Sequence, residues 1–280
     1  MDVTSVVYCV VPVYNRLEFT RRFLEYINEQ DYPSVRVIIV DDGSTDGTRD
    51  YLAQVLRPSL KILNGDGNLW WSGAMRLGMS YVMGVAKASD YLLMINNDVR
   101  IERDYISTLV RESIANGAAV VGSSQRDNVS GSLLSSGWFI DFWAMRFFTM
   151  DDREQKITVN ALPGRGVLFP MQAVFQAGNV NARLFPHYYA DMEYTARVAE
   201  LGWKILISKA ANVFSSSEPS DMQVRARGML SKYFSFRSKH NLLHKILLFS
   251  VRGPLVLRIL AIPRFPFALL VNYIRRFYGR

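Results

Sequence analysis

Residues 91–99 read YLLMINNDV, in which five apolar residues lead directly into Asn96, Asn97 and Asp98. An apolar run without alternation is typical of a strand buried on both faces, as in a parallel sheet covered by helices. Polar residues after such a strand suit an ordinary loop, yet the carboxyl edge of an open α/β sheet is also where ligands bind. The rest of the sequence has to distinguish a loop from a binding site.

The first 125 residues alternate between strand and helix signals. Strands are predicted at 5–13, 35–40, 60–63, 91–95 and 118–122, with helices between them, one of them at 74–86. The first helix is expected to begin with Asn15 as its cap, because Glu18 three residues later completes a capping-box pattern. Alternation at this spacing predicts an α/β fold with a mostly parallel central sheet and helices on both faces.

The second half of the chain is less regular. Residues 131–160 are rich in aromatic side chains and suit irregular or antiparallel strand structure. Residues 162–169, LPGRGVLF, predict a glycine-flanked turn before a strand. A helix is expected from about Asp191 to Gly202, where the glycine ends it, and a last strand at 203–207.

Charge is unevenly distributed along the 280 residues. Residues 1–221 hold 21 Lys/Arg and 25 Asp/Glu, whereas residues 222–280 hold twelve Lys/Arg and no acidic residue. We therefore predict a folded domain at 1–221, with halves at 1–125 and 126–221, followed by a basic amphipathic extension at 222–280. Such a basic segment indicates a polyanionic partner, either a membrane surface or a nucleic acid.

The end of this extension, 241–280, is apolar enough to suggest a membrane span. Arg252, Arg258 and Arg264 interrupt it, however, and no charge-free run reaches the roughly 18–20 residues that a span needs. Short amphipathic segments lying on an anionic membrane surface fit better. The alternatives are an interface between copies of the chain and packing onto the domain at 1–221.

The expected cellular setting follows from two further features. Cys9 is the only cysteine and stands in an apolar run, which fits a buried core residue in a reducing compartment. The first residues, MDVTSVVYC, lack the basic start and cleavage site of a signal peptide. We expect a cytoplasmic protein that lies peripherally on the inner face of the plasma membrane.

Polar residues follow four of the predicted strands. The segments are VPVYNR at 11–16, DDGSTDGT at 41–48, NGDGN at 64–68 and NNDV at 96–99. Each segment alone suits a turn or a helix cap. Because the carboxyl ends of parallel strands meet at one edge of a sheet, the four together indicate a ligand site.

In this order and spacing, VPVYNR, VIIVDDGSTDGT and INNDV resemble the family 2 glycosyltransferases, and the resemblance covers roughly residues 5–215. It implies a GT-A nucleotide-sugar-binding fold and inverting transfer of a sugar from a UDP- or dTDP-sugar. The implied acceptor is a hydroxyl of a glycan or lipid-linked glycan in cell-surface polysaccharide synthesis. WWSGA at 70–74 is similar to rhamnosyltransferases of this kind.

The resemblance also implies a divalent cation, Mg²⁺ or Mn²⁺. Asp98 stands at the second acid of the family's Asp-x-Asp motif, where the metal binds, and Asn96 replaces the first. Such cations take oxygen ligands and keep several waters, so one carboxylate can suffice. Many relatives add a metal-binding His after the last strand, but ANVFSSSEPS at 211–220 has none. The implied donor-binding residues are Pro12, Tyr14, Asn15, Asp41, Asp42, Asn68, Trp71, Gly73, Ala74, Asn96 and Asn97.

FPHYYADMEYTARVAELGW, at 185–203, resembles the family's segment that supplies the catalytic base. Aligned in this way, Asp191 is the base, Ala190 replaces a frequent Glu, and Glu193 is a second acid. Asp191 at a helix N-terminus also suits a plain cap. The acceptor-binding residues expected from this alignment and its surroundings are Arg165, Gly166, His187, Tyr188 and Glu193.

Two other functions compete with this reading. A sugar-phosphate nucleotidyltransferase shares the donor and metal requirements, but the chain lacks the Gly-rich basic loop expected near its N-terminus. A nucleic-acid-binding protein acting through 222–280 is the second, although its aromatic residues lie within aliphatic runs and do not form a stacking platform. We expect no nucleic-acid partner, and no Gly-x-Gly-x-x-Gly follows the first strand to suggest a dehydrogenase.

Overall fold

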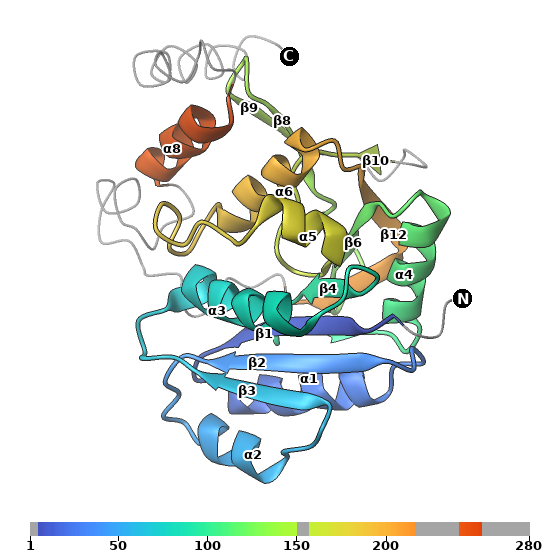
Figure 1. Cartoon of the computed structure of the whole chain (residues 1–280), viewed down its shortest axis with the longest axis vertical. Coiled ribbons are helices and arrows are strands. Elements are labelled where there is room, and N and C mark those ends of the chain that lie inside the picture. The colour runs from blue at the N-terminus through green and yellow to red at the C-terminus, as the bar shows by residue number, and fades with distance from the viewer. Residues whose placement is uncertain (1–4, 150–156, 217–240, 254–280) are drawn as a thin grey trace.

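The computed structural model describes residues 5–149, 157–216 and 241–253, and its centre is a ten-stranded sheet with helices on both faces (Figure 1). The strands of this sheet are β1 (Val7–Val13), β2 (Val35–Asp41), β3 (Leu60–Asn64), β4 (Tyr91–Met94), β5 (Arg100–Ile101), β6 (Val120–Asp127), β7 (Leu133–Ser135), β10 (Ile157–Thr158), β11 (Val167–Pro170) and β12 (Ile205–Ser215). A separate antiparallel hairpin consists of β8 (Trp138–Asp141) and β9 (Arg146–Thr149). The helices are α1 (Leu17–Asn28), α2 (Thr48–Gln54), α3 (Trp70–Val85), α4 (Tyr105–Ala115), α5 (Met171–Ala177), α6 (Ala190–Glu200) and α8 (Leu242–Arg252).

The strand order is β10-β12-β6-β11-β4-β1-β2-β3. Strands β3, β2, β1 and β4 are parallel neighbours, as the alternation of signals predicted, and β12 is parallel to β6. Strand β11 is antiparallel to β4 on one side and to β6 on the other. The expected α/β architecture is therefore confirmed. The sheet is mixed because the antiparallel strand β11 lies between β4 and β6, the fourth and fifth predicted strands.

Helices bury both faces of the sheet, which explains the unbroken apolar runs of the strands. Along β1, Tyr8 and Val10 face a cluster with α3, α5 and α6. Cys9 and Val11 face the opposite cluster, with α1 and α4. Cys9 is fully buried, as predicted, and burial raises the pKa of its thiol.

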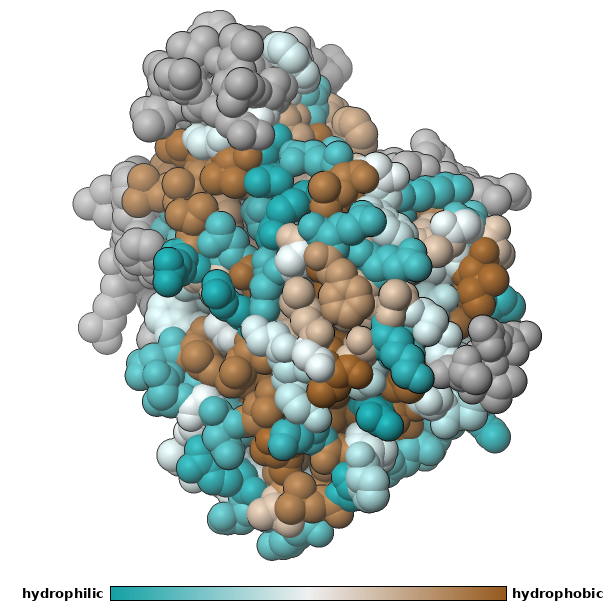
Figure 2. All heavy atoms as spheres, viewed as in Figure 1, coloured by the Kyte–Doolittle hydropathy of each residue, from teal (hydrophilic) through white to brown (hydrophobic). Residues whose placement is uncertain are grey.

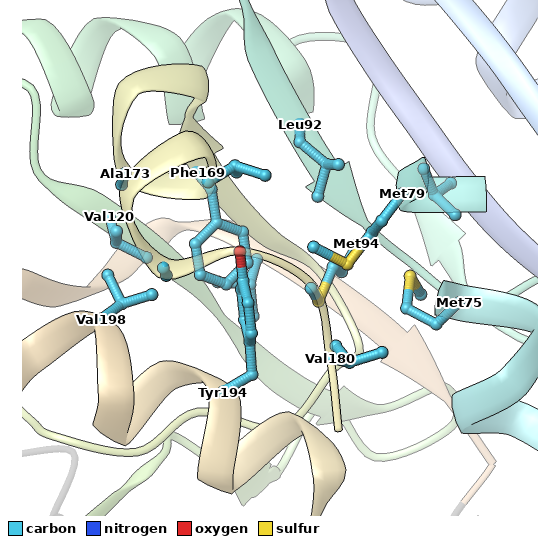
Figure 3. Close-up of a cluster of buried hydrophobic side chains, with 14 of the residues drawn as sticks. Met75, Met79, Leu92, Met94, Val120, Phe169, Ala173, Val180, Tyr194 and Val198 are labelled. Carbon is cyan, nitrogen blue, oxygen red and sulfur yellow. The ribbon is translucent and has the colours of Figure 1, made fainter. Parts of the chain in front are cut away.

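The first of these clusters anchors the helices of the second half (Figure 3). Tyr194 of α6 packs its ring edge against Phe169 of β11, with 5.3 Å between the ring centroids. Met75 and Met79 of α3 fill the space on the other side of Met94 (Figure 3). The middle of α6 is thus fixed to the sheet by a large buried aromatic pair.

Two predicted helix starts are wrong. Helix α1 begins at Leu17, and no side chain caps it. Asn15 lies outside the helix with φ of 46°, and its Oδ1 accepts the backbone N–H of Thr45 at 2.7 Å. The side chain expected to cap α1 therefore joins the loop after β1 to the loop after β2. Helix α3 begins at Trp70, four residues before the predicted Ala74.

Part of the predicted extension packs on the rest of the chain. Helix α8 contacts α6 and the β8–β9 hairpin, while 222–240 and 254–280 lie outside the described residues. Apolar side chains gather on the surface over α8 (Figure 2), where Leu243 is 47% exposed. Among the helices within the described ranges, none has the length and apolar character needed to cross a membrane.

Candidate active site

A cavity of about 380 Å³ lies where the carboxyl ends of β1, β2 and β4 meet the N-termini of α3 and α6. Both halves of the chain contribute to its wall. The lining residues are Pro12, Val13, Tyr14, Arg16, Asp42, Gly67, Trp70, Trp71, Ala74, Asn96, Asn97, Asp98, Pro163, Gly164, Arg165, His187, Tyr188 and Asp191. The segments that the sequence placed at one sheet edge thus do come together there.

Most of the residues predicted from the sequence line this cavity. Those predicted to bind the donor or the metal, which we call the donor side of the cavity, are Pro12, Tyr14, Asp42, Trp71, Ala74, Asn96, Asn97 and Asp98. Those predicted to bind the acceptor or act as the base, which we call the acceptor side, are Arg165, His187, Tyr188 and Asp191. The cavity wall does not include Asn15, Asp41, Asn68, Gly73, Gly166 or Glu193.

The two neighbouring carboxylates after β2 have different surroundings. Asp41 has no exposed surface, and its Oδ1 accepts the backbone N–H of Ser44 at 3.0 Å. Asp42 lines the cavity, and its two oxygens accept the backbone N–H groups of Gly67 and Trp70, each at 2.9 Å. Asp42 thereby fixes the start of α3, which explains why that helix begins earlier than its sequence pattern indicates.

Asp98 lies between two guanidinium groups. Its Oδ2 is 3.0 Å from a terminal nitrogen of Arg16 and 3.8 Å from one of Arg165. Its Oδ1 is buried and has no hydrogen-bond partner among the residues that the structure describes. A buried carboxylate oxygen without a partner is costly, and a cation or a ligand donor at the cavity would satisfy it.

This free oxygen fits a divalent cation held by one carboxylate, with water and a ligand completing the sphere. Among the described residues, no group of three or more His, Cys, Asp or Glu side chains is arranged to hold a metal. One carboxylate oxygen is suited to a divalent cation whose other ligands are water and the oxygens of a bound diphosphate.

Trp71 connects the donor side of the cavity to the acceptor side. Its indole N–H donates to Oδ1 of Asn96 at 2.9 Å, which leaves the Asn96 amide nitrogen to donate to a ligand. The six-membered part of the same ring covers Gly164, where an added Cβ would lie 2.5 Å from Cζ2 of Trp71. A side chain at position 164 would therefore displace the tryptophan.

Asp191 lies in the first turn of α6. Its Oδ2 accepts the backbone N–H of Gly164 at 2.8 Å, and its Oδ1 accepts that of Met192 at 2.9 Å. Burial raises the pKa of this carboxyl, while the two hydrogen bonds and Arg165 oppose the shift. A carboxylate whose pKa is raised at a cavity wall is suited to accept a proton from a bound hydroxyl.

Aromatic side chains complete the wall next to Asp191. His187 makes edge-on contacts with Trp70 and Tyr188, at centroid distances of 6.0 and 4.5 Å. Trp70 and Tyr189 hold positive φ angles of 55° and 71°, a conformation that residues with side chains rarely adopt. Strained backbone of this kind gathers at binding sites, where surrounding contacts hold it in place.

Several cavity residues were missed by the sequence analysis. These are Val13, Arg16, Gly67, Pro163 and Gly164, whereas Trp70 lines the cavity beside Trp71 in the WWSGA segment that the sequence singled out. Arg16 is the most consequential, because it pairs with a carboxylate 82 positions away. It belongs to the VPVYNR segment, so the segment was found although the role of its last residue was not.

Glu193 has a different environment from the one expected. It is 1% exposed and forms ion pairs with Arg197 and Arg252, at 3.0 and 3.3 Å. It therefore lies on the side of α6 that faces α8, away from the cavity wall. Of the two acids at 191–193, Asp191 lines the cavity, and Glu193 is buried beside α8.

Comparison with known proteins gives a consistent picture. The family model described as "Glycosyl transferase family 2" matches residues 8–175. Two curated relatives come from Streptococcus pneumoniae serotype 4 (strain ATCC BAA-334 / TIGR4). "Glycosyltransferase GlyA" is 29% identical over 106 residues and "Glycosyltransferase GlyG" is 26% identical over 114 residues. These matches cover 38% and 40% of this chain and only 14% and 36% of the two relatives.

Solved structures extend the similarity to most of the fold. The crystal structure of GalNAc-T7 with UDP, GalNAc and Mn²⁺ aligns with a TM-score of 0.61 at 11% identity, over 77% of this chain and 44% of that one. The crystal structure of S. aureus TarS 1-349 aligns with a TM-score of 0.55 at 13% identity, over 75% and 60%. The chain therefore has the fold of these glycosyltransferases, with a curled mixed sheet between helices.

Proposed function

The chain belongs to glycosyl transferase family 2, and from that premise we propose that it is an inverting enzyme acting on a nucleotide-sugar. It would move the sugar from a UDP- or dTDP-sugar to a hydroxyl of a glycan or lipid-linked glycan in cell-surface polysaccharide synthesis. The observation that carries this proposal is a single cavity lined by Asp98, Arg165 and Asp191. It combines an anion-binding side with a carboxylate suited to proton transfer.

In the proposed reaction, Asp191 takes the proton of the acceptor hydroxyl while the hydroxyl oxygen bonds to the anomeric carbon. The bond from that carbon to the donor diphosphate breaks on the opposite side, and its electron pair leaves with the nucleoside diphosphate. Attack opposite the leaving group inverts the anomeric configuration. The raised pKa of Asp191 favours this role, because a stronger base takes the proton more readily.

The leaving diphosphate gains negative charge, and Arg16 and Arg165 are the cavity's guanidinium groups suited to bind it. Together with Asp98 they leave a net positive charge at the end of β4. A Mg²⁺ or Mn²⁺ ion bound through Oδ1 of Asp98 would neutralise more of the diphosphate charge. The unpartnered Oδ1 supports this metal role, and the Asn96 amide is suited to hold a donor hydroxyl or phosphate oxygen.

The experiment that tests the function is a binding screen followed by a transfer assay. UDP-, dTDP- and GDP-sugars are added to the full chain with and without Mn²⁺, and the thermal midpoint is measured. A donor that raises the midpoint only with the metal supports the proposal. Failure of every nucleotide-sugar to bind would overturn it. If the chain instead joined a nucleoside triphosphate to a sugar phosphate and released pyrophosphate, it would be a nucleotidyltransferase. The similarity to known proteins does not favour that function.

We further propose that the basic extension, 222–280, attaches the enzyme to an anionic membrane surface on the cytoplasmic side. Two features support attachment of this segment to a membrane surface. Apolar side chains are exposed over α8, and no acidic residue follows Asp221. Each basic residue near such a surface contributes on the order of 1 kcal/mol. Arg275→Glu with Arg276→Glu should therefore weaken flotation with phosphatidylserine vesicles, most clearly at low salt. A change in oligomeric mass alone would point to an assembly interface.

A further inference from the structure

Helix α8 forms ion pairs with the helix that carries Asp191, and the Glu193 member of these pairs is buried. The Nε of Arg252 lies 3.3 Å from Oε1 of Glu193, and one terminal nitrogen lies 2.8 Å from Oε2 of Glu200. Glu193 also pairs with Arg197 at 3.0 Å. Two acids and two arginines thus form a neutral group of four between α6 and α8, which we call the α6–α8 ion cluster. Through this cluster, one helix of the basic extension is fixed to α6.

Apolar packing brings α8 against the same turn of α6. Leu248 and Phe249 of α8 belong to a buried cluster with Tyr189, Ala190 and Met192, the residues on either side of Asp191. Phe249 also makes edge-on contacts with Phe142 and Phe147, in the segment from β8 to β9, at 6.0 and 5.5 Å. The first turn of α6 is therefore enclosed by α8 on one side and open to the cavity on the other.

This turn needs external support. Tyr189, the residue before α6, has φ of 71° and provides no side-chain cap for the helix. Tyr194 anchors the middle of α6 in the core (Figure 3), but that anchor lies beyond the turn that holds Asp191. The turn is instead fixed by the Asp191–Gly164 hydrogen bond inside the cavity and by α8 outside it.

We propose that Arg252 is a positioning residue for the transfer reaction, because through Glu193 it holds the first turn of α6 with Asp191 facing the cavity. This inference rests on the proposed role of Asp191 as the base. Without Arg252, Glu193 keeps one of its two arginines, and a buried carboxylate with reduced pairing tends to move toward water. Movement of Glu193 would rotate the turn and carry Asp191 away from Gly164.

The test compares Arg252→Met with the wild-type full chain. We expect a fall in kcat of about tenfold to a hundredfold, the scale of small displacements of a reacting group. The donor dissociation constant should stay unchanged, because Arg252 contacts Glu193 and Glu200, and neither of these residues lines the cavity. Arg252→Lys should give an intermediate rate, since an ammonium can replace one of the two ion pairs. Lys245→Gln removes a positive charge from the same helix without touching the ion cluster, so its rate should equal that of the wild type.

A measurement independent of activity separates positioning from general stability. In Arg252→Met, backbone hydrogen exchange should accelerate at 164–165 and 189–193 and stay unchanged in β1, β2 and β4. An unchanged kcat would overturn the inference. So would hydrogen exchange that accelerates in β1, β2 and β4 as much as in the first turn of α6. If the wild-type chain transfers no sugar while the local exchange difference persists, the proposed function fails, but the link between Arg252 and this turn stands.

Discussion

The backbone N–H of Gly164 donates to the Asp191 carboxylate at 2.8 Å, which joins the loop before β11 to the first turn of α6. A Trp71 ring carbon would lie 2.5 Å from any Cβ at position 164. Donor-side and acceptor-side groups therefore share one small glycine as their point of contact. Changes at this point should affect binding and chemistry together, whereas changes at Asp98 and Asp191 should separate them.

Asp191→Asn should slow transfer at least about a hundredfold, the usual scale of general base catalysis, and leave donor affinity unchanged. Asparagine keeps the size of the side chain and an oxygen that can accept the Gly164 or Met192 N–H, but it cannot take a proton. Initial rates and donor titrations give the two numbers. Glu193→Gln tests the register of the motif. A near-normal rate in Asp191→Asn together with a collapsed rate in Glu193→Gln would point to an alignment wrong by two residues.

The pH dependence of the rate should report the same carboxylate. Burial raises the pKa of Asp191, so it loses its basic form at a higher pH than the ordinary Asp value of about 3.9. The rate should therefore fall on acidification with a midpoint above that value. Because the folded pKa exceeds the unfolded one, the ionised group costs stability above both, and Asp191→Asn should not lower the thermal midpoint at neutral pH. An acid limb that persists in Asp191→Asn would assign the titration to another group.

Asp98→Asn should abolish the Mn²⁺-dependent part of nucleotide binding. The substitution removes the charge that attracts the metal but leaves Arg16 and Arg165 beside the cavity. Metal-free binding of UDP should therefore stay the same or tighten, which calorimetry with and without Mn²⁺ can measure. If the variant keeps the same Mn²⁺-dependent stabilisation as the wild type, Asp98 is not the metal ligand.

Gly164→Ala should weaken donor binding and slow transfer at once, because the new methyl group would displace Trp71 from Asn96. Gly84→Ala in α3 is the matched control, since an added Cβ there meets nothing within 4 Å. The control should stabilise the helix by up to about 1 kcal/mol and leave the site unchanged. If Gly164→Ala kept the donor affinity and rate of the wild type, the position of Trp71 would not matter for binding or transfer.

Much of the site follows from strand periodicity, because parallel strands bring their carboxyl ends to one edge whatever lies between them. Asp42 and Asp98 were found in this way. Sequence spacing does not decide which of two adjacent acids at a strand end faces the ligand. Asp41 was therefore placed with Asp42, although it is buried at the end of β2. In α6, positions 191 and 193 differ by about 200° around the helix axis, which separates the two acids.

Long-range pairs are what the sequence could not reveal. Arg16 faces Asp98, and Arg252 faces Glu193, across distances in the chain that no local pattern spans. The Asn15 capping box failed for the same reason, since its side chain is engaged by the loop after β2. In each case the side chain contacts a residue from a distant part of the chain, and its neighbours in the sequence do not indicate that contact.

The position of β11 has a consequence for how the protein is made. Strand β11 lies between β4 and β6, and residues 167–170 leave the ribosome after both of its neighbours. Until then β4 and β6 each expose an unpaired edge, which in a nascent chain is a template for aggregation. A fragment that stops at residue 125 would keep those edges permanently. The sheet that residues 1–125 begin is therefore completed only by strands that come later in the chain.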